Sequence, residues 1–302
     1  MANGNKLTRR TFVEGALFGA AGLAVGAFAK AGVSAAATDR IELGRTGIRA
    51  SRVAMGTGFR GWDRSSNQVR LGRDGFHRLM RAGFDEGVNF FDLADLYGSH
   101  TYMRDLIREV GRDRVVLLSK IWFAGGGEMG SATDRAVPEI ERFRRELGTE
   151  TIDLCLIHCV TDSTWPRQLE RMRDELSELK SQGIIRATGV SCHDFGALEV
   201  AASDPWVDLI FARINNKSKV MDHEDPDAVA SVLRRARANG KAVVGMKIFG
   251  AGQLVERHER EDSLRYVWGN ELIDAMTIGF ENADQVTDTL SQLDSVLRSR
   301  AA

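Results

Sequence analysis

Short apolar segments alternate with helical segments eight times between Ser51 and Leu297, and this alternation limits the possible folds more than any other feature. The apolar segments are typical of buried parallel strands, and they span residues 51–55, 88–92, 115–120, 152–158, 188–191, 209–214, 243–247 and 276–279. Helical spacing and capping residues predict helices at 74–87, 99–110, 133–147, 165–182, 194–202, 226–239, 260–268 and 283–297. Eight strand–helix pairs in roughly 260 residues predict a single-domain α/β fold, the (β/α)8 TIM barrel.

The main alternative is a doubly wound sheet. Such a sheet usually carries a Gly-x-Gly-x-x-Gly turn between its first strand and its first helix. Residues 56–61, with the sequence GTGFRG, match that pattern in form. Trp62, Asp63 and Arg64 follow, however, and these residues do not open a helix. We therefore reject the doubly wound sheet.

Composition and charge exclude some classes of partner. The chain has 302 residues, of which 43% are hydrophobic and 27% are charged, as in an ordinary globular enzyme, and its formal net charge is −1. Beyond the first 37 residues there is no basic run to match a phosphate backbone, so we expect no nucleic-acid partner. The three cysteines are odd in number and lack the spacing of a disulfide framework.

The first 37 residues look like an export signal. A basic segment contains the twin arginine Arg9-Arg10, a Gly- and Ala-rich apolar stretch spans residues 15–28, and small residues follow up to Ala37. This order is similar to a twin-arginine (Tat) signal that is cleaved after Ala37. We expect residues 38–302 to form the barrel, exported by the Tat machinery to the periplasm or the cell exterior. A transmembrane anchor is the alternative, but the many glycines argue against it, and we expect no stable membrane anchor after cleavage.

Four polar residues stand where the predicted strands end. Asp92 ends the second predicted strand and Tyr97 follows it, Lys120 ends the third strand, and His158 ends the fourth. Each has an ordinary explanation when taken alone, because Asp caps helices, Lys is solvated at strand ends, and His and Tyr pack in cores. The carboxyl ends of barrel strands, however, converge on the face where barrel enzymes keep their chemistry. Together the four residues predict a catalytic site.

The segment around Asp92 resembles the aldo-keto reductase signature, in which a strand ends in Phe-Asp-x-Ala-x-x-Tyr-Gly. The resemblance runs from about Leu43 to the C-terminus, and it includes a hairpin at residues 41–48 that closes the bottom of the barrel in that family. It implies an oxidoreductase that reduces an aldehyde or ketone, or oxidises the matching alcohol, with NADP(H) or NAD(H). Tyr97 would be the general acid or base, and Lys120 would lower the pKa of its phenol. Asp92 would pair with Lys120 and hold it in place, and His158 would orient the carbonyl.

The resemblance also implies where a nicotinamide nucleotide would bind. The implied contacts come from the ends of the first, fifth, seventh and eighth strands, at Gly56, Thr57, Ser191, Cys192, Met246, Lys247, Gly250, Gly252, Glu281 and Asn282. Among them, Gly250 and Gly252 would let backbone N–H groups approach the pyrophosphate.

Several positions depart from the family pattern. Cys192 replaces an asparagine that binds the nicotinamide amide, Phe211 replaces a glutamine, and Met246 replaces an aromatic residue that stacks on the nicotinamide. Residues 279–285 lack the Lys or Arg that binds the 2′-phosphate in family members that prefer NADP. Glu281 could accept a hydrogen bond from the ribose 2′-hydroxyl of NAD, or it could simply lie near a helix N-terminus. The choice between NAD and NADP stays open.

Two other functions also stay open. His158, Cys159, Cys192 and His193 lie at the ends of adjacent strands, so a metal-dependent barrel enzyme is conceivable. The two cysteines could instead form a disulfide or a reactive thiol pair, although buried inert thiols are the interpretation that we favour. The loss of the asparagine and the glutamine also allows a barrel that binds a nucleotide or sugar without turnover.

Overall fold

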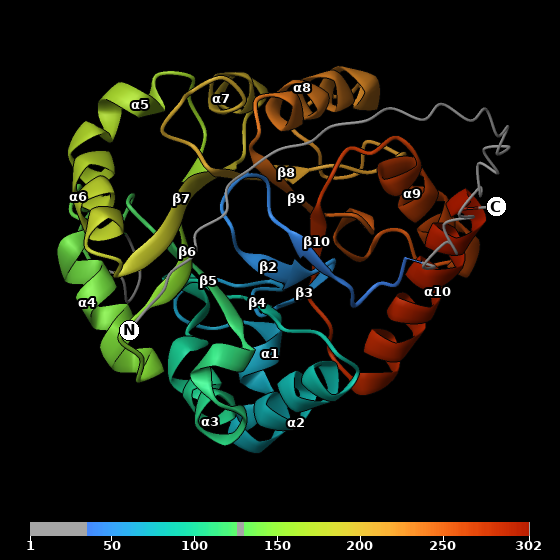
Figure 1. Ribbon diagram of the computed structural model, residues 1–302, viewed down its shortest axis with the longest axis horizontal. Helices are drawn as coiled ribbons and strands as arrows, with labels where there is room; N and C mark the ends of the chain where they lie inside the picture. The colour runs from blue at the N-terminus through green and yellow to red at the C-terminus, as the bar shows by residue number, and fades with distance from the viewer. Residues whose placement is uncertain (1–34, 126–129, 302) are drawn as a thin grey trace, which may run out of the picture. The chain divides into compact units, whose positions relative to one another are not determined.

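The computed structural model describes residues 35–125 and 130–301. Eight parallel strands form a closed barrel in which neighbours along the chain are neighbours in the sheet (Figure 1). The barrel strands are β3 (Val53–Gly56), β4 (Phe90–Asp92), β5 (Val116–Ile121), β6 (Ile152–Val160), β7 (Ile185–Cys192), β8 (Leu209–Arg213), β9 (Ala242–Met246) and β10 (Ala275–Ile278). The predicted TIM barrel is therefore confirmed.

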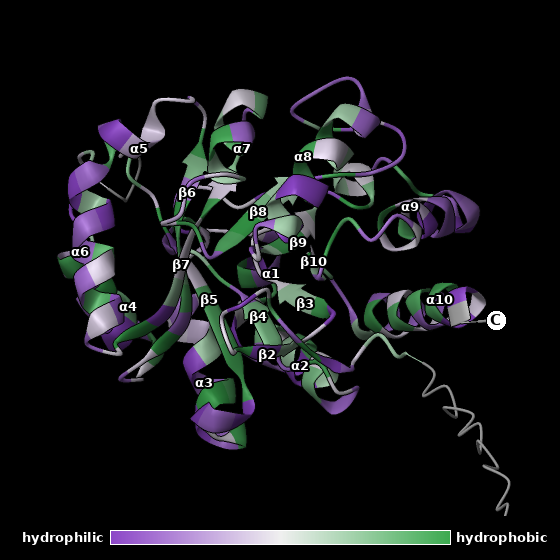
Figure 2. Cartoon of the chain, turned by 45° about the horizontal axis from the view of Figure 1, so that its top comes forward, coloured by the Kyte–Doolittle hydropathy of each residue, from purple (hydrophilic) through white to green (hydrophobic). Residues whose placement is uncertain are grey.

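Helices connect the strands and surround the barrel (Figure 1). They are α1 (Asn67–Arg70), α2 (Gly72–Asp85), α3 (His100–Val110), α4 (Val137–Leu147), α5 (Trp165–Gln168), α6 (Glu170–Ser181), α7 (Phe195–Ala201), α8 (Pro226–Ala238), α9 (Arg257–Gly269) and α10 (Ala283–Ala301), with short 3-10 turns η1 (Asp95–Tyr97), η2 (Arg112–Arg114) and η4 (Gly250–Gly252). Figure 2 shows that the helices carry both hydrophilic and hydrophobic residues, whereas the barrel strands are mostly hydrophobic. The apolar sides of the helices therefore supply the cover that buried parallel strands need.

The strands divide the core into two layers, because successive side chains of a strand point to opposite faces. Phe90 and Leu118 belong to the cluster inside the barrel. Their chain neighbours Phe91 and Leu117 belong to the larger cluster between the barrel and the helices. The barrel interior is thus a packed core, and the free space of the site lies at its end.

The predicted hairpin closes the amino end of the barrel. It consists of β1 (Arg40–Glu42) and β2 (Arg49–Ser51), and its Leu43 and Ile48 are fully buried in the inner cluster. The N–H of Arg45 donates to the carbonyl oxygen of Gly240, just before β9, at 3.1 Å. The opposite, carboxyl end of the barrel is thereby left to carry the site.

The predicted export signal lies almost entirely outside the described residues, which begin at Ala35. Ala37, the predicted cleavage position, is 1% exposed, and its N–H donates to Asp294 Oδ1 of α10 at 2.7 Å. Arg52 also binds the carbonyl oxygen of Ala36, at 3.2 Å. In the described part of the chain, no helix has both the length and the apolar character to cross a membrane.

Candidate active site

The four predicted catalytic residues come from three neighbouring strands. Asp92 is the last residue of β4, Tyr97 lies in the turn η1 that follows, Lys120 is near the end of β5, and His158 is near the end of β6. These strands pair in sequence, so their carboxyl ends bring the side chains together. The exposed fractions are 5% for Asp92, 2% for Lys120 and 3% for His158, and the polar groups therefore interact in a site with little water.

Lys120 and Asp92 form a fixed ion pair. The Lys120 ammonium donates to Oδ1 of Asp92, and also to the carbonyl oxygen of Leu93 at 3.0 Å. The second carboxylate oxygen of Asp92 accepts a hydrogen bond from the Thr277 hydroxyl of β10 at 2.8 Å. Both oxygens of the carboxylate are occupied, so Asp92 holds Lys120 in one position.

Tyr97 lies between Lys120 and His158. Its hydroxyl is 3.3 Å from Nε2 of His158, and the Lys120 ammonium lies 4.9 Å from the centre of the phenol ring. Gly58 packs directly on this ring, because a β-carbon there would be 2.2 Å from Cζ of Tyr97. A larger residue at position 58 would collide with Tyr97, so the glycine allows the ring to sit where it does.

The surroundings of Tyr97 and His158 set their protonation. Burial raises the pKa of Tyr97 well above its ordinary value, and the negative charge of Asp92 raises it further. The lowering that we expect from Lys120 is not the net result, because burial is the largest effect on the pKa of Tyr97. The Lys120 ammonium faces the ring and is itself paired with Asp92. Burial lowers the pKa of His158 well below its ordinary value, and Lys120 adds to that effect. At neutral pH, Tyr97 therefore keeps its proton and His158 is uncharged.

Asp95 supports the site, although its position after the strand did not single it out. It is 1% exposed, and its carboxylate accepts hydrogen bonds from the N–H groups of Trp122 at 2.9 Å and Leu96 at 2.6 Å. Burial raises the pKa of Asp95 to about 6. The contact holds the end of β5, where the Trp122 ring lies 6.0 Å from the His158 ring, centre to centre.

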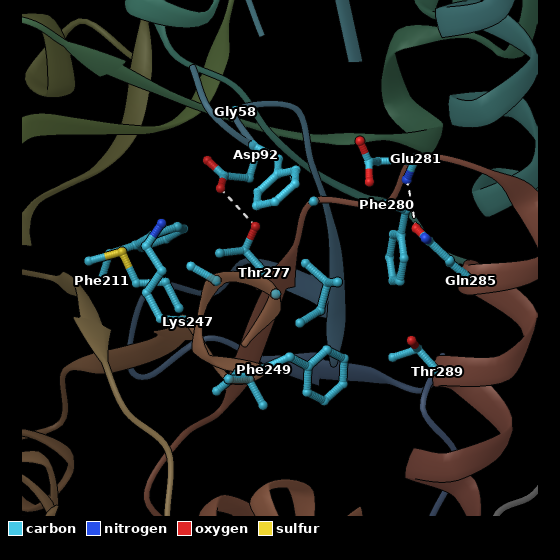
Figure 3. Close-up of a pocket in the computed structure, with 18 of the residues that line it drawn as sticks. Gly58, Asp92, Phe211, Lys247, Phe249, Thr277, Phe280, Glu281, Gln285 and Thr289 are labelled. Atoms are coloured by element: carbon cyan, nitrogen blue, oxygen red, sulfur yellow. Dashed lines mark hydrogen bonds between the residues drawn. The ribbon is translucent and has the colours of Figure 1, made fainter. Parts of the chain in front are cut away.

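A cavity of about 410 Å³ opens from these residues. Its lining includes Asp92, Tyr97, Lys120 and His158 together with Glu281, Gln285 and Thr289. Figure 3 shows Glu281, Gln285 and Thr289 on the side of the pocket away from Phe211 and Lys247. Its volume is within the range of small-molecule sites. The cavity therefore joins the four catalytic candidates to the segment after the eighth barrel strand.

Six of the ten predicted cofactor residues line this cavity, namely Gly56, Ser191, Met246, Lys247, Gly252 and Glu281. Gly250 and Gly252 were expected to offer backbone N–H groups to a pyrophosphate. These N–H groups donate within the turn instead, to the carbonyl oxygens of Lys247 at 2.8 Å and Phe249 at 3.0 Å. Glu281 is exposed and accepts a hydrogen bond from Asn67 Nδ2 at 2.6 Å.

The other predicted cofactor residues, Thr57, Cys192, Gly250 and Asn282, are not among the lining residues. Thr57 is buried, and its hydroxyl hydrogen-bonds the carbonyl oxygen of Asp92 at 2.9 Å and the Ser99 hydroxyl at 2.8 Å. Asn282 Oδ1 accepts from the N–H of Gln285 at 3.0 Å, in the first turn of α10. Thr57 thus positions Asp92, and Asn282 caps a helix.

Pattern reasoning did not find several lining residues, namely Phe59, Phe249, Thr277, Gln285 and Asp288. Of these residues, only Thr277 could have been predicted from the sequence, because it is a polar residue near the end of a barrel strand, as Lys120 and His158 are. The others lie in loops or on α10, and they reach the cavity through the tertiary fold.

Cys159 and His193 meet beside the catalytic residues. Cys159 has a φ of +59°, and the register of β6 against β7 shifts between Ile157 and Val160, which marks an irregularity at the rim of the barrel. Sγ of Cys159 is 3.4 Å from Nε2 of His193, whose Nδ1 faces the guanidinium of Arg213. Because arginine can only donate, Nδ1 must accept, and Nε2 carries the hydrogen that points to the sulfur.

Among the residues that the structure describes, the Cys/His cluster is not arranged as a metal site. Burial lowers the pKa of His193 to about 3 and raises that of Cys159 to about 11, so both groups are uncharged at neutral pH. Cys192 is fully buried among apolar residues, and the three cysteines are free thiols. Within residues 35–125 and 130–301, no group of three or more His, Cys, Asp or Glu side chains is arranged to hold a metal ion.

The arrangement suits one kind of proton transfer. Tyr97 holds a proton, a neutral imidazole lies 3.3 Å from its oxygen, and a fixed Lys–Asp pair lies behind the ring. An oxygen atom that gains negative charge at this point would receive a proton and a hydrogen bond together. A carbonyl oxygen that becomes an alcohol oxygen is such an atom.

Comparison with known sequences identifies the family. The model of the Aldo/keto reductase family matches residues 54–298. The NADH-specific methylglyoxal reductase of Escherichia coli is 24% identical over 273 residues, which cover 84% of this chain and 79% of that protein. Methylglyoxal reductase DkgB of Salmonella typhi is 26% identical over 148 residues, which cover 47% of this chain. The chain spans about half the length of DkgB, at 51%.

Solved structures share the fold. An aldo-keto reductase from Bacillus halodurans has a TM-score of 0.67 at 16% identity, covering 86% of this chain and 95% of that one. An aldo-keto reductase from Klebsiella pneumoniae, solved in complex with NADPH, has a TM-score of 0.62 at 21% identity, covering 85% of this chain and 89% of that one. Since the family match spans the barrel strands and all four predicted catalytic residues, the chain belongs to the aldo/keto reductase family.

Proposed function

We propose that this protein reduces an aldehyde or ketone to the alcohol, or oxidises the alcohol, with a nicotinamide nucleotide as the redox partner. The contact between the Tyr97 hydroxyl and Nε2 of His158, at 3.3 Å, carries the proposal. It provides a proton donor and a second hydrogen-bonding group for one carbonyl oxygen. The bound nucleotide would supply the hydride to the carbonyl carbon, or accept it in the reverse direction.

In this proposal, each catalytic residue has a separate role. Tyr97 donates its proton to the carbonyl oxygen, and the Lys120 ammonium, 4.9 Å from the ring centre, stabilises the phenolate that remains. His158 donates from Nε2 to the same oxygen. Its Nδ1 is buried without a partner among the described residues, and in this tautomer it carries no hydrogen. Asp92 holds Lys120 in place.

The cavity fits a nicotinamide nucleotide by its extent and by the groups along it. Ser191, Met246 and Phe211 line the end near Tyr97, and Gly252 and Glu281 line the rest. Ser191 would bind the nicotinamide amide, Met246 would contact the ring, and Glu281 would bind the ribose of the adenosine half. The first turn of α10, with its positive dipole end, borders the same region.

A small carbonyl compound is the first substrate to test. Two relatives, from Escherichia coli and Salmonella typhi, are named methylglyoxal reductases. A cavity of about 410 Å³ that must also admit part of a nucleotide favours a small substrate.

NADH is expected to support methylglyoxal reduction with a kcat/KM at least about tenfold above that with NADPH. Glu281 and Asp288 both line the far end of the cavity, and the only arginine among its described lining residues, Arg260, is 3.3 Å from Asp288 as an ion pair. A 2′-phosphate there would face the Glu281 carboxylate, while Arg257 and Arg260 are both already paired with Asp288, and a like-charge contact of this kind weakens binding. Initial rates and fluorescence titrations with both reduced nucleotides measure the preference.

The change Glu281→Gln removes the negative charge while keeping the shape of the side chain. It should raise kcat/KM with NADPH more than kcat/KM with NADH, so that the two values become closer. Glu199→Gln, an exposed change on α7, is the matched control. Equal kcat/KM with NADH and NADPH in the wild-type protein would contradict the proposed NAD preference but not the proposed redox function. Failure of either nucleotide to bind would contradict the redox function.

We also propose that the twin-arginine segment exports the protein in folded form, since an enzyme that folds before export can load its nucleotide in the cytoplasm. The double change Arg9→Lys and Arg10→Lys keeps the charge, and it is expected to retain the protein in the cytoplasm at full length. Lys30→Arg, which also keeps charge, should leave export unchanged. Immunoblots of cell fractions give the result, and normal export of the double variant would refute a Tat signal.

A further inference from the structure

Lys247 lies at the carboxyl end of β9 and lines the same cavity as Tyr97 and His158. Its φ of +58° is in the left-handed region, which is uncommon for a residue with a side chain. Its carbonyl oxygen accepts hydrogen bonds from Asn215 Nδ2 at 3.1 Å and from the N–H of Gly250 at 2.8 Å. The backbone is therefore held in a strained conformation that places a cation in the site.

The Lys247 ammonium has no hydrogen bond or ion pair with any residue that the structure describes. Arg213 and Lys120 are close enough to repel it, whereas Asp92 is already bound by Lys120 and Thr277. The thiol of Cys159 is uncharged at neutral pH, because its pKa is raised to about 11. Among residues 35–125 and 130–301, therefore, no anionic side chain is left to pair with Lys247.

Burial makes this isolation costly. Removal from water lowers the pKa of Lys247, and the charge of Arg213 adds to the effect. A partly buried charge without a counter-charge destabilises a protein, and such a group is retained most readily where a ligand completes the pair. The missing partner is therefore an anionic group of a bound molecule.

We propose that Lys247 binds the carboxylate of the substrate, and that the substrates of this site are oxo acids, which carry a carbonyl and a carboxylate in one molecule. The inference rests on the proposed carbonyl reduction. The other candidate anion is the pyrophosphate of the nucleotide. The charged groups that influence Lys247 are Arg213, Asp92 and Lys120, all at the catalytic end. Figure 3 shows Lys247 beside Phe211, across the pocket from Glu281 and Gln285.

The test compares succinic semialdehyde with its methyl ester, which has the same aldehyde and no charge. Lys247→Met is expected to lower kcat/KM for the acid about 10- to 100-fold, mainly through KM, because a charge-assisted hydrogen bond is lost. It should change kcat/KM for the ester and the Kd of NADH much less, whereas a nucleotide contact, the role that the family resemblance implies for Lys247, would weaken NADH binding. Lys247→Arg should restore most of the preference for the acid, and Lys217→Met, on an exposed residue of the loop after β8, should change neither substrate.

Equal losses for acid and ester, together with weaker NADH binding, would overturn the inference in favour of the pyrophosphate. Unchanged kinetics for both compounds would overturn it as well. If the wild-type protein reduces neither of these compounds nor methylglyoxal, the proposed function fails, and a binding measurement then tests Lys247. Calorimetric titration should then show succinamate, an unreactive carboxylate, binding more tightly than neutral succinamide, with the difference lost in Lys247→Met. Equal binding of the two would overturn the anion site.

Discussion

Tyr97→Phe is expected to lower kcat for carbonyl reduction by about 100- to 10,000-fold, the usual contribution of a positioned general acid. The substitution removes only the hydroxyl, whose contact with Nε2 of His158 is 3.3 Å long. The ring that remains can still pack on Gly58 and below the Lys120 ammonium. The affinity for NADH and the melting temperature should therefore stay close to those of the wild-type protein. Steady-state rates, a fluorescence titration and a thermal melt measure the three quantities.

Tyr102→Phe is the matched control. Tyr102 lies on α3, where its ring packs against Phe76 at 5.5 Å between centres, away from the cavity. The same loss of a phenol hydroxyl there should leave kcat unchanged. A Tyr97→Phe protein that keeps more than about a tenth of the wild-type kcat would remove Tyr97 from the role of proton donor, because general acids contribute more than this.

The barrel could be predicted from the sequence because buried parallel strands leave short apolar segments that local pattern alone detects. The ends of the helices were harder to predict. The predicted helix 165–182 is two helices, α5 and α6, because Leu169 between them has φ −114° and ψ 25°. The predicted helix 133–147 begins at Val137, since the N–H of Thr133 instead bonds the carbonyl oxygen of Phe123 at 2.9 Å. These departures depend on tertiary contacts that periodicity does not contain.

The convergence of Asp92, Tyr97, Lys120 and His158 could be predicted because the carboxyl ends of parallel barrel strands meet. The protonation states of these residues could not be predicted in the same way. The direction of the Tyr97 pKa depends on how deeply the ring is buried and on which side of it Lys120 lies. The lack of an ion-pair partner for Lys247 likewise depends on the structure, because it requires knowing that Asp92 is already bound by Lys120 and Thr277. Fold topology determines which residues meet, whereas side-chain geometry determines what they can do.

Lys120→Met is expected to abolish measurable turnover and also to lower the free energy of unfolding by about 3–5 kcal/mol. The Asp92 carboxylate, which is 5% exposed, would keep a hydrogen bond from the Thr277 hydroxyl but would have no counter-charge. Breaking a buried ion pair by removing one partner is costly because an uncompensated charge stays behind. By contrast, Lys180→Met removes the partner of Asp208 in a pair that is 38% and 27% exposed, and it should cost at most about 1 kcal/mol. Urea unfolding measures both variants.

The double variant Asp92→Leu, Lys120→Met separates the two effects of Lys120. With neither charge present, the free energy of unfolding should return toward the wild-type value, because buried ion pairs contribute little beyond what apolar side chains of similar size provide. Turnover should stay lost, since the Tyr97 ring would have no cation beside it to stabilise the phenolate. If the double variant recovers activity along with stability, the pair serves only the fold. If it recovers stability alone, the chain retains a costly buried charge because the chemistry of Tyr97 requires it.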